Sequence, residues 1–571
     1  MESETQSPTP SPAEAFSEAA QAFLKNLLGA EGSAPDSAPS VQIDPAKLAA
    51  LQAGCLQQHA ALWHSMLTRH AGGDAKPVVS PEPGDRRFSS AEWLRNPWFD
   101  YLRQSYLINS RFLSEWVEAL NAEPRAKERL RFITRQFADA VSPANFVATN
   151  PEALKLAMET QGQSLAKGVR QLVEDMHKGR ISHTDESAFE VGRNLAVTEG
   201  AVVFENELIQ LIQYKPLTPK VFARPLVMIP PSINKYYILD LRPENSFVRY
   251  ALEQGHSVFM VSWRNITAEV GHFTWDDYVE KGALKALEVA RAISGTEEVN
   301  VLGFCVGGTI LGTALAVLAA RSDKCVKSAT FLAAMLDFSD TGDIRVFIDE
   351  RSIAAREAEI GRGGVMSGKD IAMAFTALRA NDLVWSYVVN GYLKGQRPEA
   401  LDLLFWNADG TNLPGPMYCW YVRNTYLENR LREPGRSSVL GVPVDLGKVT
   451  VPAYVLATRE DHIVPWRTAY QTTQLLQGEA RFVLGASGHV AGVINPPSKN
   501  KRSHWVGGKP TANAEAWLAA ATERPGSWWT DWSQWLERFG GESVPAPSRL
   551  GNAEFSPIEP APGRYVRQRI E

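Results

Sequence analysis

The sequence predicts an α/β protein with a mostly parallel sheet, an inserted cap subdomain and an all-α region that precedes the sheet. Three observations support this fold class. From about residue 189, short β-branched runs alternate with helical stretches, and such alternation is typical of parallel sheets. Residues 336–448 show little strand character and far exceed an ordinary connection of about 2–6 residues, which indicates an insertion. From residue 91 to about residue 179 the periodicity is helical throughout.

The predicted strands are apolar segments rich in β-branched residues. They are residues 201–214, 225–229, 257–263, 299–304, 327–334, 452–458 and 481–485. Helices are predicted between most of them, including residues 278–294 and 309–321. This order indicates βαβ units that contribute to one sheet.

We predict three regions along the chain: a flexible and partly helical segment at residues 1–90, a helical domain at 91–188 and the α/β domain at 189–571. Residues 16–28 place apolar side chains on one helical face, which either docks on its own domain or meets an amphiphilic interface. The aromatic residues of the helical region are predicted to be core and packing surface. They are Trp93, Trp98, Tyr101, Tyr106, Phe112, Trp116, Phe132, Phe137 and Phe146.

Composition and charge exclude several classes of protein. The chain of 571 residues has a net charge of −5, so it lacks the global basic field that holds nucleic acid. Its 4 cysteines include no C-x-x-C pair, which excludes a disulfide framework and a zinc ribbon. No metal-ligand spacing is found. This pattern suits the reducing cytosol.

Targeting and membrane signals are also weak. Glu2 and Glu4 stand where a secretory signal needs positive charge. Residues 299–320 carry no charge and are long enough to span a bilayer. We interpret them as a buried strand followed by a buried helix, divided at Gly307-Gly308, and expect a soluble, cytoplasmic protein without a transmembrane segment.

The most informative segment is Gly303-Phe304-Cys305-Val306-Gly307-Gly308, between an apolar strand and an apolar helix. In the nucleophile elbow of an α/β-hydrolase fold, this turn lifts the central side chain above the sheet, and small flanking residues let strand and helix approach. Cys305 is therefore predicted to be a nucleophile, the alternative being a buried structural thiol. The positive end of the helix favours a thiolate. The N–H of Val306 is placed to meet an oxyanion.

An acid and a base follow in the chain order that this fold requires, each after a strand. Asp461 ends the strand at 452–458 and precedes an H-I-V-P turn, so it is preferred to Glu460. His489 follows the strand at 481–485 and is preferred as base to His462, which adjoins the acid. His504 lies in a Lys/Arg-rich stretch and is predicted to face solvent.

A second oxyanion donor is expected in the loop after the strand at 225–229, from the backbone N–H of Ser232 or Ile233. The identity of the nucleophile carries chemical information as well. A thiolate that attacks a thioester exchanges one thioester for another of similar energy, whereas hydrolysis works equally well with serine. Cysteine in this elbow therefore favours acyl transfer from a thioester such as acyl-CoA.

Over many separate blocks the sequence resembles the class I polyhydroxyalkanoate synthases. The matching blocks are SPANF (142–146), TNPE (149–152), PPSINKYYILD (230–240), VSWRN (261–265), GFCVGG (303–308), NLPGP (412–416), DHIVP (461–465) and GH (488–489). The resemblance covers roughly residue 91 to the C-terminus. Residues 1–80 contain no recognised block.

The resemblance implies polymerisation of (R)-3-hydroxyacyl-CoA, most of all 3-hydroxybutyryl-CoA, into a polyester with release of CoA. It implies Cys305 as the acylated nucleophile, His489 as its base and Asp461 as the group that orients the base. The N–H groups of Val306 and Ile233 become the expected oxyanion donors. Candidate substrate-binding residues are Asn234, Arg379 and His462, with Arg379 and Lys235 as candidates to meet the CoA phosphates.

The resemblance also implies partners and location. No metal or organic cofactor is expected. The expected partners are the acyl-CoA substrate, the polyester product, the polymer granule surface with its associated proteins, and a second copy of the chain in a homodimer. Exit of an apolar polymer calls for an apolar surface, for which Phe405-Trp406, Trp420-Tyr421 and the tryptophans of residues 528–535 are candidates; buried packing is the alternative.

Two alternatives to the polymerase remain at this point. One is a Cys-dependent α/β-hydrolase that acts on esters or lactones. The other is a scaffold protein with an inactive hydrolase fold. The large insertion and the helical region speak against a compact hydrolase, and the combination of Cys305, Asp461 and His489 speaks against an inactive scaffold.

Overall fold

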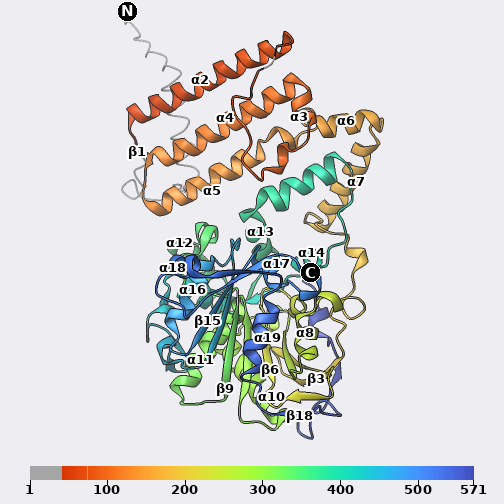
Figure 1. Cartoon of the computed structure of the whole chain (residues 1–571), viewed down its shortest axis with the longest axis vertical. Helices are drawn as coiled ribbons and strands as arrows, with labels where there is room; N and C mark the ends of the chain where they lie inside the picture. The colour runs from red at the N-terminus through yellow and green to blue at the C-terminus, as the bar shows by residue number, and fades with distance from the viewer. Residues whose placement is uncertain (1–41, 74, 571) are drawn as a thin grey trace, which may run out of the picture. The chain divides into compact units, whose positions relative to one another are not determined.

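The computed structural model describes residues 42–73 and 75–570, and the chain divides into two compact units (Figure 1). The first unit comprises the described residues up to Gly168 together with Tyr392–Gly395, and the second comprises the remainder. The amphipathic helix predicted within residues 16–28 lies outside the described residues. The predicted boundaries at residues 90 and 188 stay predictions.

The first unit is built of helices, three of them long and lying side by side with α4 in the middle (Figure 1). Its helices are α2 (Pro45–His70), α3 (Glu92–Arg95), α4 (Pro97–Ala119), α5 (Pro124–Ala140), α6 (Pro151–Glu159) and the start of α7 (Gln163–Lys178). An Asp or Asn followed by Pro begins α2, α4 and α6, and each polar side chain accepts a hydrogen bond from the first turn. Such pairs start helices because they satisfy free N–H groups and preset the backbone.

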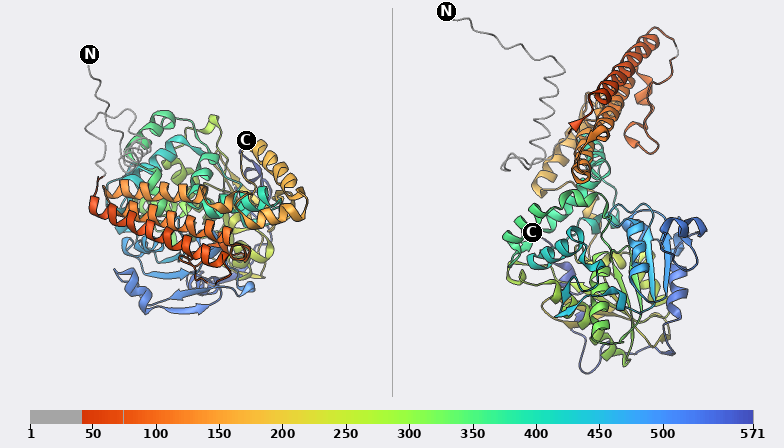
Figure 2. Two further views of the ribbon diagram at one scale, coloured as in Figure 1. Left: turned by 90° about the horizontal axis from the view of Figure 1, so that it is seen from above. Right: turned by 90° about the vertical axis from the view of Figure 1, so that its left-hand side faces the viewer.

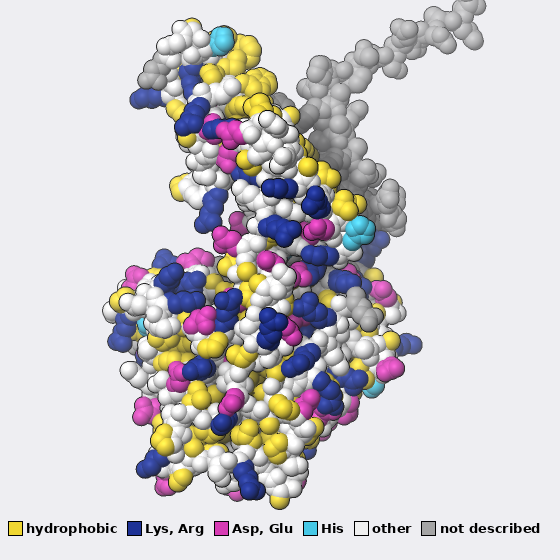
Figure 3. Space-filling model, turned by 90° about the vertical axis from the view of Figure 1, so that its right-hand side faces the viewer, with side chains coloured by type: hydrophobic (Ala, Val, Ile, Leu, Met, Phe, Trp, Pro, Cys, Tyr) yellow, Lys and Arg dark blue, Asp and Glu magenta, His cyan; other side chains and the backbone are white. Residues whose placement is uncertain are grey.

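Packing in the first unit only partly follows the predicted aromatic core. Trp93 and Tyr106 are buried, as predicted. Trp98, Phe137 and Phe146 are each about half exposed, at 54%, 49% and 52%, so the prediction was wrong for these three. Periodicity identifies a helical face but not whether a neighbour covers it. Figure 3 shows hydrophobic side chains at the surface of this helical unit.

The second unit contains an 11-stranded sheet with the order β17-β16-β15-β14-β9-β8-β6-β7-β4-β3-β19. The strands are β3 (Gly200–Glu205), β4 (Ile209–Tyr214), β6 (Leu226–Ile229), β7 (Val258–Trp263), β8 (Val299–Phe304), β9 (Val326–Leu332), β14 (Ala453–Thr458), β15 (Ala480–Gly485), β16 (Ser503–Val506), β17 (Thr522–Pro525) and β19 (Glu559–Pro560). The six strands from β15 to β7 are parallel, and the outer pairings are antiparallel. This confirms the predicted α/β fold class with its mostly parallel sheet.

Helices cover both faces of this sheet (Figures 1 and 2). On β8, Val299 and Val301 join the core beneath α10 (Lys285–Ser294), α11 (Val306–Ala320) and α16 (Trp466–Leu475). Leu302 and Phe304 join the opposite core beneath α8 (Phe247–Glu253) and α19 (Trp529–Glu537). Alternation along a strand sends successive side chains to opposite faces, which is why a strand buried on both sides is apolar throughout.

The segment between β9 and β14 has four helices and only short strand pairs. The helices are α12 (Glu350–Ile360), α13 (Gly368–Leu378), α14 (Asp402–Asn407) and α15 (Gly415–Val422). Its strand pairs are β10 (Val365–Met366) with β11 (Leu413–Pro414) and β12 (Ser438–Val439) with β13 (Val442–Pro443). π-Helical turns interrupt the helices, one of them η11 (Arg423–Leu427). Turns of this kind are frequent at functional sites.

Several predicted elements differ from the structure. The strand predicted at 201–214 is the hairpin β3–β4, and the segment 299–320 divides at Cys305 instead of at Gly307-Gly308, because α11 already begins at Val306. β16, β17 and β19 were not predicted, so β15 is not the last strand of the sheet. No helix within the described ranges is long and apolar enough to cross a membrane.

Candidate active site

The elbow at the end of β8 holds Cys305 in a backbone conformation that few residues with a side chain adopt. Its φ is 53° and its ψ is −127°, and its N–H donates to the carbonyl of Leu332 on β9. A Cβ on Gly303 would lie 2.6 Å from the Cα of Gly308, and a Cβ on Gly307 would lie 2.2 Å from the carbonyl oxygen of Ile229. Only glycine fits these positions, so close packing of strand, turn and helix fixes the thiol at the sheet edge.

The acid and the base meet at the same edge of the sheet. Asp461 follows β14 and His489 follows β15, and the His489 Nδ1 lies 2.7 Å from the Asp461 Oδ2. Asp461 also accepts hydrogen bonds from the Thr458 hydroxyl at 3.1 Å and from the N–H groups of Ile463 and Val464 at 2.9 and 2.8 Å. These contacts fix the carboxylate, and through it the imidazole plane.

The neighbours of His489 shift the pKa of its imidazole upward. Burial lowers the pKa of His489, but the negative charges of Asp461 and Cys305 and the hydrogen bonds to both raise it well above its ordinary value. The imidazole ring also stacks on Phe304, with centroids 5.5 Å apart. Because Nδ1 faces Asp461, Nε2 is the nitrogen left to exchange a proton with Cys305.

Backbone donors lie next to the elbow. Val306 is the first residue of α11, whose first-turn N–H groups have no partner within their own helix. The loop after β6 approaches this turn closely, since the carbonyls of Ile229 and Pro230 would contact a Cβ on Gly307. Ile233, which lies three residues further along this loop than Pro230, lines one cavity together with Val306. The two expected oxyanion donors therefore border a common space.

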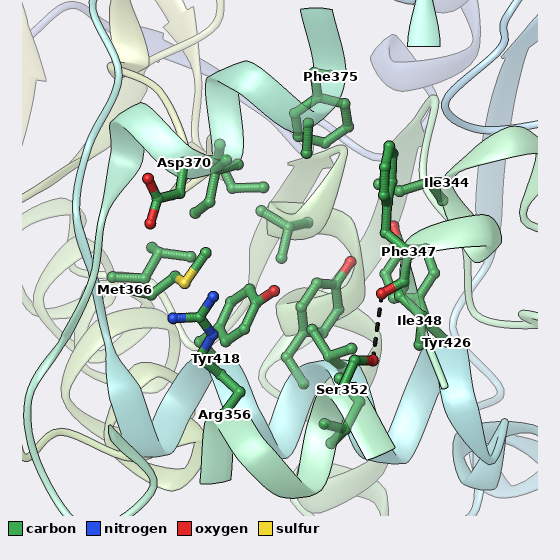
Figure 4. A pocket seen from close by; sticks show the side chains of 18 of the residues that line it. Ile344, Phe347, Ile348, Ser352, Arg356, Met366, Asp370, Phe375, Tyr418 and Tyr426 are labelled. Carbon is green, nitrogen blue, oxygen red and sulfur yellow. Dashed lines mark hydrogen bonds between the residues drawn. The ribbon is translucent and has the colours of Figure 1, made fainter. Parts of the chain in front are cut away.

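That cavity has a volume of about 250 Å³ and is enclosed largely by the insertion (Figure 4). Its lining is mostly apolar, with Ile344, Phe347, Ile348, Ile353, Met366, Phe375 and Met417 among the residues that form it. Polar groups are few: Arg356, Asp370, Ser352 and the tyrosines 418, 421 and 426. An apolar chamber with a few polar groups, next to Val306 of the elbow, suits a small and mostly apolar ligand.

Comparison with known proteins identifies the family of this chain. Residues 84–251 match the family described as Poly-beta-hydroxybutyrate polymerase (PhaC) N-terminus, and residues 225–496 match the alpha/beta hydrolase fold family. The chain is 54% identical to the Poly(3-hydroxyalkanoate) polymerase subunit PhaC of Cupriavidus necator, over 94% of this chain and 90% of that protein. The chain belongs to the poly(3-hydroxyalkanoate) polymerase family. It is an acyltransferase-type enzyme, and the resemblance seen in the sequence is confirmed.

The chain is also similar to a second polymerase and to a solved lipase structure. The poly(3-hydroxyalkanoate) polymerase of Methylorubrum extorquens is 44% identical over 92% of this polymerase and 88% of its own length. Among solved structures, the monoacylglycerol lipase of Paleococcus ferrophilus matches with a TM-score of 0.32 and 12% identity, over 49% of this chain and 90% of that chain.

The residues predicted to bind substrate are placed differently in the polymerase. His462 is half-buried, and burial, followed by the nearby charge of Arg379, lowers its pKa. Arg379 itself is exposed, 3.6 Å from Asp382. The Asn234 amide nitrogen lies 3.5 and 3.4 Å from the backbone carbonyls of residues 406 and 407. His462 thus lies near Asp461 and His489, and Arg379 lies near His462, whereas Asn234 is engaged with the chain itself.

Two predictions about polar residues were wrong. Lys235, a candidate for the CoA phosphates, is only 2% exposed and donates to the carbonyl of Gln568, so no phosphate can reach it. His504 does not face solvent but lies on β16, buried, with its Nδ1 3.2 Å from the carbonyl of Gly526. The tryptophans at 406, 528, 529, 532 and 535 are also buried, which agrees with the alternative of buried packing and not with an exit surface for the polymer.

Sequence analysis named Tyr421 only as part of a possible exit surface and did not name Tyr426, but both line the cavity beside Val306. Burial raises the pKa of both Tyr421 and Tyr426, and the charge of Cys305 is among the causes that raise each further. They come from α15 and η11, a region where neither helical nor strand periodicity is sustained. Within the described residues no group of three His, Cys, Asp or Glu side chains could hold a metal ion.

Proposed function

We propose that this polymerase joins (R)-3-hydroxyacyl-CoA units, preferentially 3-hydroxybutyryl-CoA, into polyhydroxyalkanoate and releases CoA through a covalent thioester on Cys305. The observation that carries the proposal is the elbow thiol beside the His489–Asp461 pair, with a 2.7 Å bond between the last two. The polymerase names of the relatives supply the class of product.

In the first half of the reaction, Cys305 gives its proton to the His489 Nε2, and the sulfur attacks the thioester carbonyl of acyl-CoA. A carbon–sulfur bond forms at Cys305 while the bond to CoA breaks, and the CoA sulfur leaves with the proton from His489. Asp461 stabilises the imidazolium that exists between these steps. The products are free CoA and an acylated Cys305.

In the second half, a hydroxyl group of another hydroxyacyl unit replaces CoA as the partner. His489 takes the hydroxyl proton, and the oxygen attacks the Cys305 thioester. An ester bond forms, the bond to sulfur breaks, and Cys305 recovers its proton from His489. The polyester grows by one unit, and no water is consumed.

Each half passes through a tetrahedral oxyanion, for which the N–H groups of Val306 and Ile233 are the proposed donors. The acyl side chain would occupy the cavity of about 250 Å³ that these two residues border. The modest volume supports a short acyl chain. The apolar lining excludes water from the thioester, which favours transfer to a hydroxyl over hydrolysis.

Location and assembly follow from the insolubility of the product. We propose that the enzyme works in the cytoplasm at the surface of the polymer granule, beside other granule-associated proteins, and as a homodimer. Exposed apolar side chains of the helical unit, such as Trp63 and Trp98 at 51% and 54% exposure, support an association with an apolar surface.

The test is a Cys305→Ala variant assayed for CoA release from (R)-3-hydroxybutyryl-CoA, with turbidity as the sign of polymer. We expect CoA release to stop in Cys305→Ala and to continue in Cys325→Ala, which removes a buried thiol just before β9. Mass spectrometry of the wild-type enzyme should find a hydroxybutyryl group on the peptide that contains Cys305. CoA release without turbidity would indicate a hydrolase, and undiminished turnover by Cys305→Ala would refute the proposal.

A further inference from the structure

A buried lysine lies two residues after the proposed oxyanion donor Ile233. Lys235 is 2% exposed, and its Nζ donates a hydrogen bond of 2.5 Å to the backbone carbonyl of Gln568, near the end of the chain. Burial of an ammonium group is costly unless other groups compensate it. A lysine exposed to solvent would avoid this cost, so the burial of Lys235 needs a physical explanation.

The loop that contains Lys235 is fixed along its backbone by one segment of the insertion. The N–H of Thr411 donates to the carbonyl of Ile233 at 2.7 Å, and the indole Nε1 of Trp406 donates to the carbonyl of Lys235 at 2.7 Å. Between them, Asn234 forms a β-bridge with Gly410. The position of the Ile233 N–H therefore depends on residues 406–411.

The C-terminal tail packs against that same segment. Arg569 lies over the ring of Phe405, 5.1 Å from its centroid, and the Ile570 side chain lies next to Gly410. The tail is itself anchored upstream, because β19 pairs with β3 and Val566 is 1% exposed. Lys235 is thus bonded to a fixed part of the structure.

We propose that Lys235 is a positioning residue that ties the C-terminal tail to the loop of residues 230–235 and so holds the Ile233 N–H at the site of the oxyanion. The inference rests on the proposed function, since it assumes that Ile233 is a donor. Lys235 does not reach the reacting atoms and acts through the backbone of the loop.

The charged groups around Lys235 favour a tie that depends on pH. Burial lowers the pKa of Lys235 to about 8; the carboxylate of Asp409 opposes this effect and the guanidinium of Arg569 adds to it. The Tyr237 hydroxyl donates to the Asp409 Oδ2 at 2.9 Å and holds that carboxylate in place. Asp409 is therefore the group that keeps Lys235 charged near neutral pH.

The test compares Lys235→Met with Lys215→Met, an exposed lysine paired with Glu199. In Lys235→Met we expect kcat for CoA release to fall by about 30-fold with KM within about twofold, because the loss of oxyanion contacts affects the transition state. Alkylation of Cys305 by iodoacetamide, followed by mass spectrometry, should keep its wild-type rate, since displacement at a saturated carbon forms no oxyanion.

Hydrogen exchange gives an independent measurement of the tie. The amides of residues 232–236 and 565–570 should both exchange faster in Lys235→Met and be unchanged in Lys215→Met. An unchanged kcat, or a parallel fall of kcat and of Cys305 alkylation, would overturn the inference. Failure of the proposed function itself would give a different result, because CoA release would then persist in Cys305→Ala.

Asp409→Asn provides a second variant that preserves volume and the bond from Tyr237. The loss of the carboxylate lowers the pKa of Lys235 further, so we expect kcat to fall more at pH 8 than at pH 6.5, again with unchanged Cys305 alkylation. A kcat equal to wild type at both pH values would contradict the role of Lys235. This variant decides the question even if Lys235→Met does not fold.

Discussion

Replacing Asp461 by asparagine tests the hydrogen-bond geometry of the site with no change in side-chain volume. The Oδ1 of Asp461 accepts from two backbone N–H groups, at 2.9 and 2.8 Å, so the oxygen of an asparagine must take this place. The asparagine NH₂ group then faces the His489 Nδ1, which must become an acceptor. The imidazole proton moves to Nε2, the nitrogen that should receive the proton of Cys305.

The expected cost follows from this wrong tautomer. The corresponding substitution in a serine protease triad lowers kcat by about 10⁴, equivalent to about 5.5 kcal/mol. We expect Asp461→Asn to lower kcat for CoA release by about 10³–10⁴, with a smaller effect on KM. The measurement is release of free thiol from (R)-3-hydroxybutyryl-CoA at saturating substrate, with circular dichroism to verify folding.

Glu460→Gln is the matched control, since Glu460 is the adjacent acid and is exposed. It removes the same charge one residue away and should leave kcat within about twofold. If Asp461→Asn retained kcat within about tenfold of wild type, orientation of His489 by Asp461 would not be part of the mechanism.

Two further variants test the close packing of the elbow and the effect of the buried His256 on stability. In Gly307→Ala the added Cβ would lie 2.2 Å from the carbonyl of Ile229, so we expect kcat to fall by at least about 10² and stability to urea by about 1–3 kcal/mol. Gly54→Ala, which has open space around its Cβ within α2, should leave kcat unchanged and should not lower stability, because alanine is the better helix former. A fully active Gly307→Ala would contradict the close-packed elbow. His256 is 1% exposed, its ring nitrogens have no hydrogen-bond partner among the described residues, and burial lowers its pKa to about 4. Between pH 6.5 and 4 the unfolded chain binds the proton more tightly, so stability is lost as pH falls through this window, by up to about 3 kcal/mol. Urea unfolding at pH 7 and pH 4.5 should therefore show a smaller acid loss in His256→Phe, and equal losses in both proteins would refute the assignment.

The three residues proposed to be catalytic could be brought together from the sequence because each follows a strand within about four residues. The strand signals are local, being runs of β-branched residues with a turn residue behind them, and the parallel sheet brings their ends to one edge. Cys305, Asp461 and His489 lie at the ends of β8, β14 and β15 in the structure. The roles of these three residues remain predictions, but strand order alone was enough to predict that they lie close together.

The remainder of the site depends on contacts that sequence periodicity does not encode. Tyr421 and Tyr426 belong to a stretch that passes from α-helix to π-helix, where no regular apolar spacing persists. Lys235 is bonded to a carbonyl 333 residues away. His504 was misplaced because basic neighbours suggested a loop, whereas its short strand β16 lies between β17 and β15 and pairs antiparallel with both.

The backbone at Cys305 has a consequence for how this protein can change over time. A positive φ at a residue with a side chain costs about 1–3 kcal/mol, and glycine would relieve it. Selection for a more robust fold and selection for turnover therefore act in opposite directions at this single codon. A lineage that no longer needs the polyester would gain stability from the same substitution that we expect to end its synthesis.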